Sequence, residues 1–283
     1  MTEMIPKHEF WRRQYSADRY MEAISDAELD LRFADVFTNQ LLLCAHGKIG
    51  IGAGLWTEKF AHLQAEYSIR GRDFPNAAEI ERRLIVPSQA SSALSERLKQ
   101  DYPNGVPPAF TLFKYGKKEH LAPLIDKGSL RLMPASSYED PSLNPATEDS
   151  ELHFEKIWKG ERTRYRSQFD YYCFCSSFLH LDRLIADFGA DSILVVRDPW
   201  GFFRRIAETL NETSFQIYFK AVSYLDPLLL DEAEVADVAV VKHMRFAYQF
   251  EHRFVAMPTA ETPLEPRHLE LGSLHDIATL YSG

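Results

Sequence analysis

Apolar side chains recur at helical spacing early in the chain. Leu29, Phe33 and Val36 follow one another at intervals of three or four residues, which places them on one face of a helix. Ser25 stands just before this run and Glu28 lies three residues later, which is the spacing of a capping box. The pattern therefore predicts a helix that begins after Ser25 and buries the side that carries the three apolar residues.

The helical spacing continues to about residue 100 and then stops. Residues 55–67 predict a second amphipathic helix that ends near Gly71, and shorter helices are expected over 76–83 and 87–98. The stretch 101–108 (DYPNGVPP) contains three prolines and an Asn-Gly pair, which is the composition of a linker. We therefore expect a domain boundary in this stretch.

Beyond the linker, short strand patterns mix with helix patterns. Runs rich in β-branched and aromatic residues predict strands at 110–114, 130–133, 171–178, 192–197, 215–225 and 249–257. Helical patterns predict a helix ending at Gly128 and helices over 181–188, 201–210 and 274–281, with 233–246 helical or mixed. Because strands and helices do not alternate strictly, the sequence predicts an α+β fold. The predicted domains are a helical N-terminal region over 1–105 and a mixed domain over 109–283.

The composition is that of a folded protein with an acidic balance. The chain has 283 residues, of which 45% are hydrophobic and 13% aromatic, which is more apolar than disordered chains are. Its 32 Lys and Arg against 41 Asp and Glu give a net charge of -9, which disfavours phosphate binding over the whole surface. No apolar run is long enough to span a bilayer, and charges occupy the N-terminus where a signal peptide is apolar. We therefore expect a soluble, cytoplasmic protein without membrane contact.

Several familiar kinds of site are not indicated. Cys44, Cys173 and Cys175 are too few for a disulfide framework or for a zinc site built from separated ligand pairs. No metal is therefore expected. The glycine-rich run 47–54 fits neither common phosphate-binding pattern and is interpreted as a connection.

Two polar segments each allow two interpretations. Residues 156–166 (KIWKGERTRYR) interleave basic and aromatic side chains as nucleic-acid-binding segments do, yet a solvated helix face is the favoured interpretation. Residues 134–150 predict a long polar loop, in which Tyr138 and the Asp-Pro pair 140–141 form either a lid over a ligand or a plain turn. The plain turn is slightly favoured.

A third polar pattern lies within the last long strand prediction. On a strand, Gln249, Glu251 and Arg253 project from one face, while Phe250 and His252 project from the other. One interpretation is a half-solvated strand with a ladder of opposite charges, which spacing alone favours. The other is a carboxylate in a cleft, which would stabilise the positive charge that develops when a glycosidic bond breaks.

Short motifs in the second domain resemble a bacterial family, the "domain of unknown function 2971". The resemblance covers residues 112–255, about half of the chain, and leaves the N-terminal helices outside. The motifs, in the order of the family, are 112–115 (LFKY), 137–141 (SYEDP), 173–177 (CFCSS), 185–189 (IADFG) and 248–253 (YQFEHR).

The same order of motifs resembles the three-part site of ADP-ribosyltransferases. That resemblance implies a split β-sandwich with NAD, the substrate, bound in its cleft. It implies that Glu251 stabilises the ribose as nicotinamide leaves and that Gln249 helps to orient the acceptor. Ser176 or Ser177 would support the site, as part of the Ser-Thr-Ser-like strand.

The resemblance also implies the residues that contact NAD. Lys114 or Tyr115 stands where the first motif has its polar residue, and Tyr138 and Arg253 are further NAD-binding candidates. The chain departs from the pattern in two places: Lys114 replaces Arg or His, and residues 175–177 read Cys-Ser-Ser in place of Ser-Thr-Ser.

Three functions follow as hypotheses. The first is an ADP-ribosyltransferase or NAD glycohydrolase, acting on a protein, a nucleic acid or water, for which a bacterial toxin or antiphage effector is one context. The second is a non-catalytic module that binds a nucleotide or a partner on the same fold. The third is a nucleic-acid-modifying effector, for which residues 156–166 are the direct support. The pattern does not indicate an oligomeric state.

Overall fold

The N-terminal helices form where the apolar spacing predicts them. The computed structural model describes residues 6–44, 53–76, 78, 80, 89–102, 110–139, 151–210, 214–230 and 232–283. The helices of the first part are α1 (Lys7–Ala17), α2 (Asp26–Cys44), α3 (Ala53–Arg70) and α5 (Gln89–Asp101). The capping box before α2 is confirmed: Ser25 N donates to Glu28 Oε2 over 2.8 Å, and Glu28 N donates to Ser25 Oγ over 3.3 Å. The predicted apolar face of α2 is buried.

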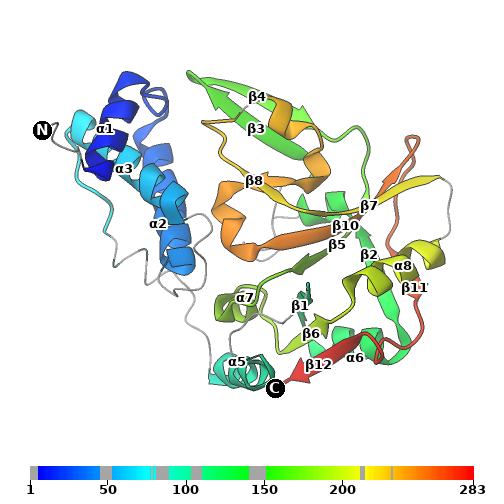
Figure 1. The fold of residues 1–283 in the computed structure, drawn as a ribbon. Helices are drawn as coiled ribbons and strands as arrows, with labels where there is room; N and C mark the ends of the chain where they lie inside the picture. The colour runs from blue at the N-terminus through cyan, green and yellow to red at the C-terminus, as the bar shows by residue number, and fades with distance from the viewer. Residues whose placement is uncertain are drawn as a thin grey trace, which may run out of the picture.

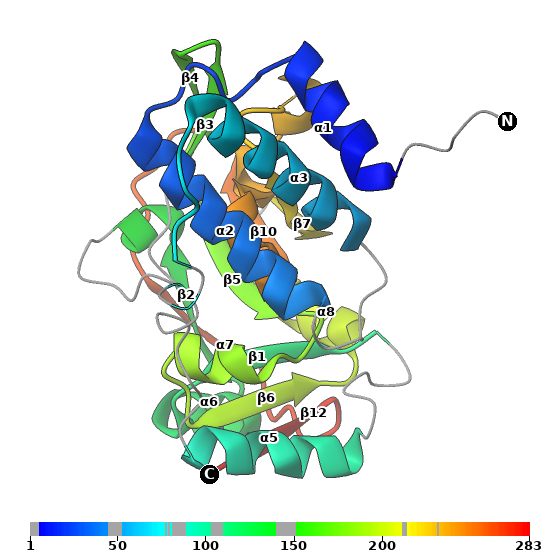
Figure 2. The same cartoon turned by 90° about the vertical axis from the view of Figure 1, so that its left-hand side faces the viewer.

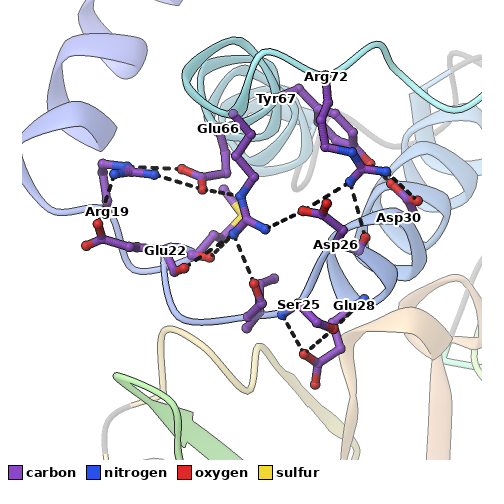
Figure 3. A network of polar contacts seen from close by, with 12 residues as sticks. Arg19, Glu22, Ser25, Asp26, Glu28, Asp30, Glu66, Tyr67 and Arg72 are labelled. Atoms are coloured by element: carbon purple, nitrogen blue, oxygen red, sulfur yellow. Dashed lines mark hydrogen bonds and ion pairs between the residues drawn. The ribbon is translucent and has the colours of Figure 1, made fainter.

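A network of polar and charged side chains joins α3 to α2 and to the segment between α1 and α2 (Figure 3). Glu66 of α3 is buried and accepts hydrogen bonds from Tyr15, Arg19 and Arg70 over 2.5, 3.0 and 2.6 Å. Because two cations and a hydroxyl face this carboxylate, its pKa is lowered in spite of the burial that by itself would raise it. The network therefore holds Tyr15 and Arg19 against the C-terminal part of α3.

An antiparallel sheet forms the second part of the molecule (Figure 1). Within the described residues it has eight strands: β1 (Leu112–Gly116), β2 (Ser129–Pro134), β5 (Tyr172–Ser177), β6 (Ser192–Val196), β7 (Phe215–Ala221), β10 (Glu251–Pro258), β11 (Arg267–Glu270) and β12 (Ala278–Ser282). One path runs β11-β2-β5-β1-β6-β12, and β10 pairs with both β5 and β7. The predicted α+β class is confirmed.

The sheet divides at β5. On one side, β10 pairs with β5 along its length, from Ala256 opposite Tyr172 to Glu251 opposite Ser177. On the other side, β2 pairs with the start of β5 and β1 pairs with its end, at Ser177. The middle of β5 therefore lies between two strands that diverge.

Alternation along the strands separates two apolar cores. Phe113 and Tyr115 of β1 pack with the N-terminal helices, whereas Leu112, which precedes Phe113, packs on the opposite face. That opposite face is covered by α6 (Lys118–Lys127) and α8 (Pro199–Leu210). Helix α7 (Asp182–Asp187) and α5 lie against each other on the first face, near the C-terminus (Figure 1).

The turn after α6 requires glycine. The helix ends at Gly128, as the sequence predicted, and this glycine adopts the left-handed conformation with φ of 72°. A Cβ atom at this position would lie 2.2 Å from the carbonyl oxygen of Gly272. Glycine is needed here both for its backbone conformation and for the close approach of the two chain segments.

Shorter elements complete the described chain. They are the hairpin β3 (His153–Trp158) and β4 (Glu161–Arg166), the parallel pair β8 (Ser223–Leu225) and β9 (Val241–His243), and the 3-10 helices η1 (Ala135–Glu139), η2 (Glu232–Val235), η3 (Val238–Val240) and η4 (Met244–Gln249). The hairpin turns at Lys159 and Gly160, both with positive φ.

The structure corrects three of the element predictions. Residues 156–166 are not a helix face but the hairpin, because β-formers such as Tyr165 pack toward the apolar cluster that includes Phe154. Residues 274–281 are not a helix, because 278–282 pair with β6 as strand β12. The predicted strand 215–225 divides into β7 and β8.

Other sequence predictions lie partly outside the described residues. Most of the predicted linker, the glycine-rich run and residues 140–150 of the predicted loop fall there. Helix α2 contacts η4, and α5 contacts α7 and β12, so several elements join the helical region to the sheet region. No helix of the described chain is long and apolar enough to cross a membrane.

Candidate functional site

A cavity opens where the sheet divides, between β1, β5 and the start of β10. It measures about 190 Å³ and lies on the face of the sheet that also carries Phe113 and Tyr115. Its lining includes aromatic side chains, among them Tyr138 of η1 and Phe188 after α7, and charged and polar side chains. Such a combination of apolar and polar groups is typical of ligand sites.

The structure brings most of the predicted site residues to this cavity. Gln249, Glu251, Ser176, Ser177, Lys114, Tyr115 and Tyr138 all line it. Arg253 does not line the cavity, because its side chain is fully excluded from solvent beneath Glu251. Contact of Arg253 with a ligand in the cavity is therefore not supported, and its contacts give it another role.

Arg253 holds two carboxylates. Its Nε donates to Glu251 Oε1 over 2.6 Å, and its Nη2 donates to Glu151 Oε1 over 2.8 Å. A third hydrogen bond runs from Nη1 to the carbonyl oxygen of Ala239 over 2.8 Å. Since Glu251 is only 5% exposed, the strand is not the half-solvated charge ladder that spacing alone favoured. Glu251 and Arg253 instead form a buried ion pair.

Lys242 of β9 approaches the same carboxylate from the other side. Its Nζ lies 3.0 Å from Glu251 Oε2 and 3.3 Å from Gln249 Oε1. It also lies 3.8 Å from Glu151 Oε1. Lys242 is 5% exposed and lines the cavity, so it is the cation of this cluster that reaches the cavity wall.

These charges fix the ionisation of Glu251. Burial alone would raise its pKa, but the positive charges of Arg253 and Lys242 outweigh burial and hold the pKa of Glu251 well below its usual range. The carboxylate therefore stays ionised at neutral pH. Each carboxylate oxygen has two acceptor sites, so the contacts with Arg253 and Lys242 leave capacity for a further hydrogen bond.

The neighbouring Cys175 thiol has a raised pKa, in contrast to the lowered pKa of Glu251. A hydrogen bond with Cys173, burial and the charge of Glu251 together raise the pKa of the Cys175 thiol well above its ordinary value. A protonated thiol is a poor nucleophile. Cys175 therefore contributes a weakly polar side chain to the cavity and is not suited to attack a substrate.

The two candidate serines lie on opposite faces of β5. Ser177 pairs with Glu251, and its hydroxyl lies 2.7 Å from Gln249 O and 2.6 Å from Leu179 O, to which it donates. Ser176 pairs with His252 and donates to His252 O over 3.1 Å. Because side chains alternate along a strand, only Ser177 shares the face of Glu251. The structure thus shows which of the two serines shares a strand face with Glu251, a choice that the sequence left open.

The residues at the first motif are engaged by the protein. Lys114 Nζ donates to Cys175 O over 2.8 Å, at the point where β5 lies between its diverging neighbours, and lies 4.8 Å from the Phe174 ring centroid. The Tyr115 hydroxyl lies 3.0 Å from His180 Nδ1. Lys114 therefore links β1 to β5, Tyr115 contacts the segment between β5 and α7, and both side chains line the cavity.

An unusual backbone conformation joins Gln249 to Glu251. Gln249 ends η4, and Phe250 adopts the left-handed conformation with φ of 47° and ψ of 46° before β10 begins. Such a conformation is uncommon for a residue with a bulky side chain. Gln249 and Glu251 reach the cavity across this turn, and not by simple strand alternation as the sequence suggested.

Two charged residues of the cluster were absent from the sequence-based site. Glu151 follows the predicted loop and Lys242 lies in the segment predicted to be helical or mixed. Lys242 comes directly after the apolar run 238–241, so a lone charge beside a buried strand was the available signal. Glu151 carried no comparable signal.

Comparison of the chain with family models, with curated protein sequences and with solved structures found no match. The resemblances described from short motifs therefore remain predictions. Within the described residues, no group of three or more histidine, cysteine, aspartate or glutamate side chains is arranged to hold a metal ion.

Proposed function

We propose that this chain binds NAD at the cavity and cleaves the bond between nicotinamide and ribose, passing ADP-ribose to a macromolecule or to water. One observation carries the proposal: Gln249, Glu251, Ser176 and Ser177, which the motif order assigned to the site, line the same cavity. The serines lie more than 70 residues before Gln249 in the sequence. Pairing of β5 with β10 sets Ser177 opposite Glu251, and the Ser177 hydroxyl donates to Gln249 O.

The chemistry of the cavity suits this reaction. As the glycosidic bond breaks, its electron pair leaves with nicotinamide and positive charge develops on the ribose. An ionised carboxylate fixed beside the ribose stabilises that charge more than it stabilises the uncharged sugar, which lowers the barrier. Glu251 meets this need, because Arg253 and Lys242 keep it ionised and hold it in one orientation.

The size of the cavity limits what it encloses. Sites for small molecules commonly measure about 300–1,000 Å³, and this cavity measures about 190 Å³. Only part of a dinucleotide fits inside. We therefore place the nicotinamide and its ribose in the cavity, beside Glu251 and the aromatic side chains that line it. The remainder of NAD lies outside the cavity.

A second function, a binding module without turnover, is favoured by one specific observation. Lys242 and Arg253 balance the charges of Glu251 and Glu151, so the described cluster is neutral overall. A neutral cluster attracts a developing positive charge less than an unpaired carboxylate would. The same cavity would then hold a nucleotide without breaking it.

One experiment distinguishes the two functions. Nicotinamide release from NAD is measured with the wild type, with Glu251→Gln and with Glu270→Gln, which makes the same change at an exposed residue of β11. Saturable NAD binding is measured on the same samples by calorimetry. Release by the wild type and Glu270→Gln but not by Glu251→Gln supports the enzyme. Binding without release supports the module. The absence of both binding and release would exclude both functions.

A further inference from the structure

Helix α2 makes contact at two points with the part of the chain that carries Lys242 and Gln249. One point is Asp226, just after β8, and the other is η4. At the first point, Arg32 donates from two nitrogens to the two carboxylate oxygens of Asp226, each over 2.7 Å. Lys59 of α3 binds the same carboxylate. Arg32 and Asp226 are both buried, so the contact is shielded from solvent.

This first contact lies directly beside the strand that supports the site. Asp226 follows the last residue of β8, and β8 pairs with β9 so that Tyr224 stands opposite Lys242. The Tyr224 hydroxyl accepts a hydrogen bond from Glu251 N over 2.7 Å. The ion pair on α2 is therefore two residues from a side chain that touches the start of β10.

At the second point, a single amide of α2 binds η4. Asn39 is 0% exposed, and its Nδ2 donates to the carbonyl oxygens of Met244 and Arg245 over 3.3 and 3.1 Å. Its Oδ1 accepts a hydrogen bond from Tyr248 N over 3.0 Å. Figure 2 shows α2 passing across the region of β5 and β10.

A short 3-10 helix depends on such contacts. Its hydrogen bonds have poorer geometry than those of an α-helix, so its conformation is set largely by what packs on it. Here η4 leads directly into Gln249 and then into the left-handed turn at Phe250. A shift of η4 would move Gln249 and change the approach of Lys242, which precedes η4 by two residues.

We propose that Asn39 is a positioning residue for the cavity, and that α2 completes the site by fixing the segment from Asp226 to Gln249. The effect on turnover rests on the proposed function, whereas the effect on the segment does not. The helical N-terminal region is then part of the working site and not an independent attachment.

The test compares three variants of the full chain. Asn39→Ala removes the three hydrogen bonds that the Asn39 side chain makes with η4. Asn39→Asp keeps the acceptor for Tyr248 N but places an oxygen against the two carbonyls. Gln40→Ala changes the next residue of the same helix and serves as the matched control. Amide hydrogen exchange is followed by mass spectrometry in peptides covering 244–251 and 192–196, together with kcat and KM for nicotinamide release.

We expect Asn39→Ala to speed exchange in 244–251 and to leave 192–196 at the wild-type rate. We expect its kcat to fall by about tenfold or more with KM changed little, because small misplacements of reacting groups act on the chemical step. Asn39→Asp loses both donated bonds and repels the two carbonyls, so its exchange in 244–251 should stay faster and its kcat lower than in the wild type, and Gln40→Ala should match the wild type.

Three results would overturn the inference: unchanged exchange in 244–251, an equal rise in 192–196, or a local rise with wild-type kcat. If the wild type itself releases no nicotinamide, the proposed function fails but the exchange data still decide whether Asn39 fixes the segment. A rise confined to 244–251 then supports the structural assignment, and any other pattern rejects it.

Discussion

Arg253 and Glu251, two positions apart on β10, form a buried ion pair in which Nε lies 2.6 Å from Oε1. Strand alternation puts both side chains on the same face, and Glu151 and Lys242 complete the group around them. Two carboxylates thus face two cations within a region that solvent scarcely reaches. Removing any one of the four leaves the buried cluster with one unbalanced charge.

The first prediction concerns Glu251→Gln. We expect turnover to be lost, and we also expect the free energy of unfolding to fall by about 3–5 kcal/mol, because breaking a buried pair leaves Arg253 and Lys242 facing one carboxylate. Adding Lys242→Met restores the balance of charge, so the double variant should regain part of the stability and none of the activity. Urea denaturation and nicotinamide release measure the two effects separately.

A single variant that loses activity only because it unfolds would mislead. Both variants are therefore assayed well below their unfolding temperatures, with Glu270→Gln as the matched surface control. Full turnover in the folded double variant would remove Glu251 from the mechanism. A double variant no more stable than Glu251→Gln would contradict the charge-balance argument.

The second prediction concerns the pH dependence set by Lys242. Its positive charge lowers the pKa of Glu251, so Lys242→Met should raise that pKa. Activity requires the ionised carboxylate, and the acid limb of the pH–rate profile should therefore move to higher pH. Lys242→Arg keeps the charge and should return the limb toward its wild-type position. An unmoved limb in Lys242→Met would show that this cation does not control Glu251.

The part of the site that the sequence indicated depends on local properties of the chain. Gln249, Glu251, Ser176 and Ser177 were assigned from short motifs, and the shared face of Glu251 and Arg253 follows from their spacing on β10. The helices α2 and α3 were predicted for the same reason, since their apolar positions recur within a few residues. In each case the information lies close together in the chain.

What the sequence did not indicate depends on distant pairing. Glu151 meets Arg253 across 102 positions, and no local pattern marks a partner that far away. The hairpin β3–β4 was assigned to a helix because basic residues at short intervals fit either element. The left-handed turn at Phe250 is also invisible locally, since it is held by packing and not favoured by the residue type.

The third prediction separates the two serines. Ser177→Ala removes the hydroxyl that binds Gln249 O, and should cost about 1–3 kcal/mol of stability by leaving a buried carbonyl without this donor. We also expect a lower kcat, because the end of η4 loses its tie to β5. Ser176→Ala removes only the hydrogen bond to His252 O on the opposite face of β5, and should lower kcat less than Ser177→Ala does. Equal effects of the two substitutions on kcat would contradict this assignment.

The fourth prediction concerns Asp35 of α2, which lines a second cavity beside Arg245. Burial raises the pKa of Asp35 to about 6, against the opposing charges of Arg245 and Arg32. A carboxyl whose pKa is higher in the folded state stabilises the fold at low pH, and this contribution disappears as the pH rises from its unfolded value of 3.8 to about 6. Asp35→Asn should therefore raise the free energy of unfolding above pH 6 and change it little below pH 4. Urea denaturation across this range measures the difference, with Asp73→Asn as the exposed control, and an equal gain at both ends would show that the ionisation of Asp35 is not responsible.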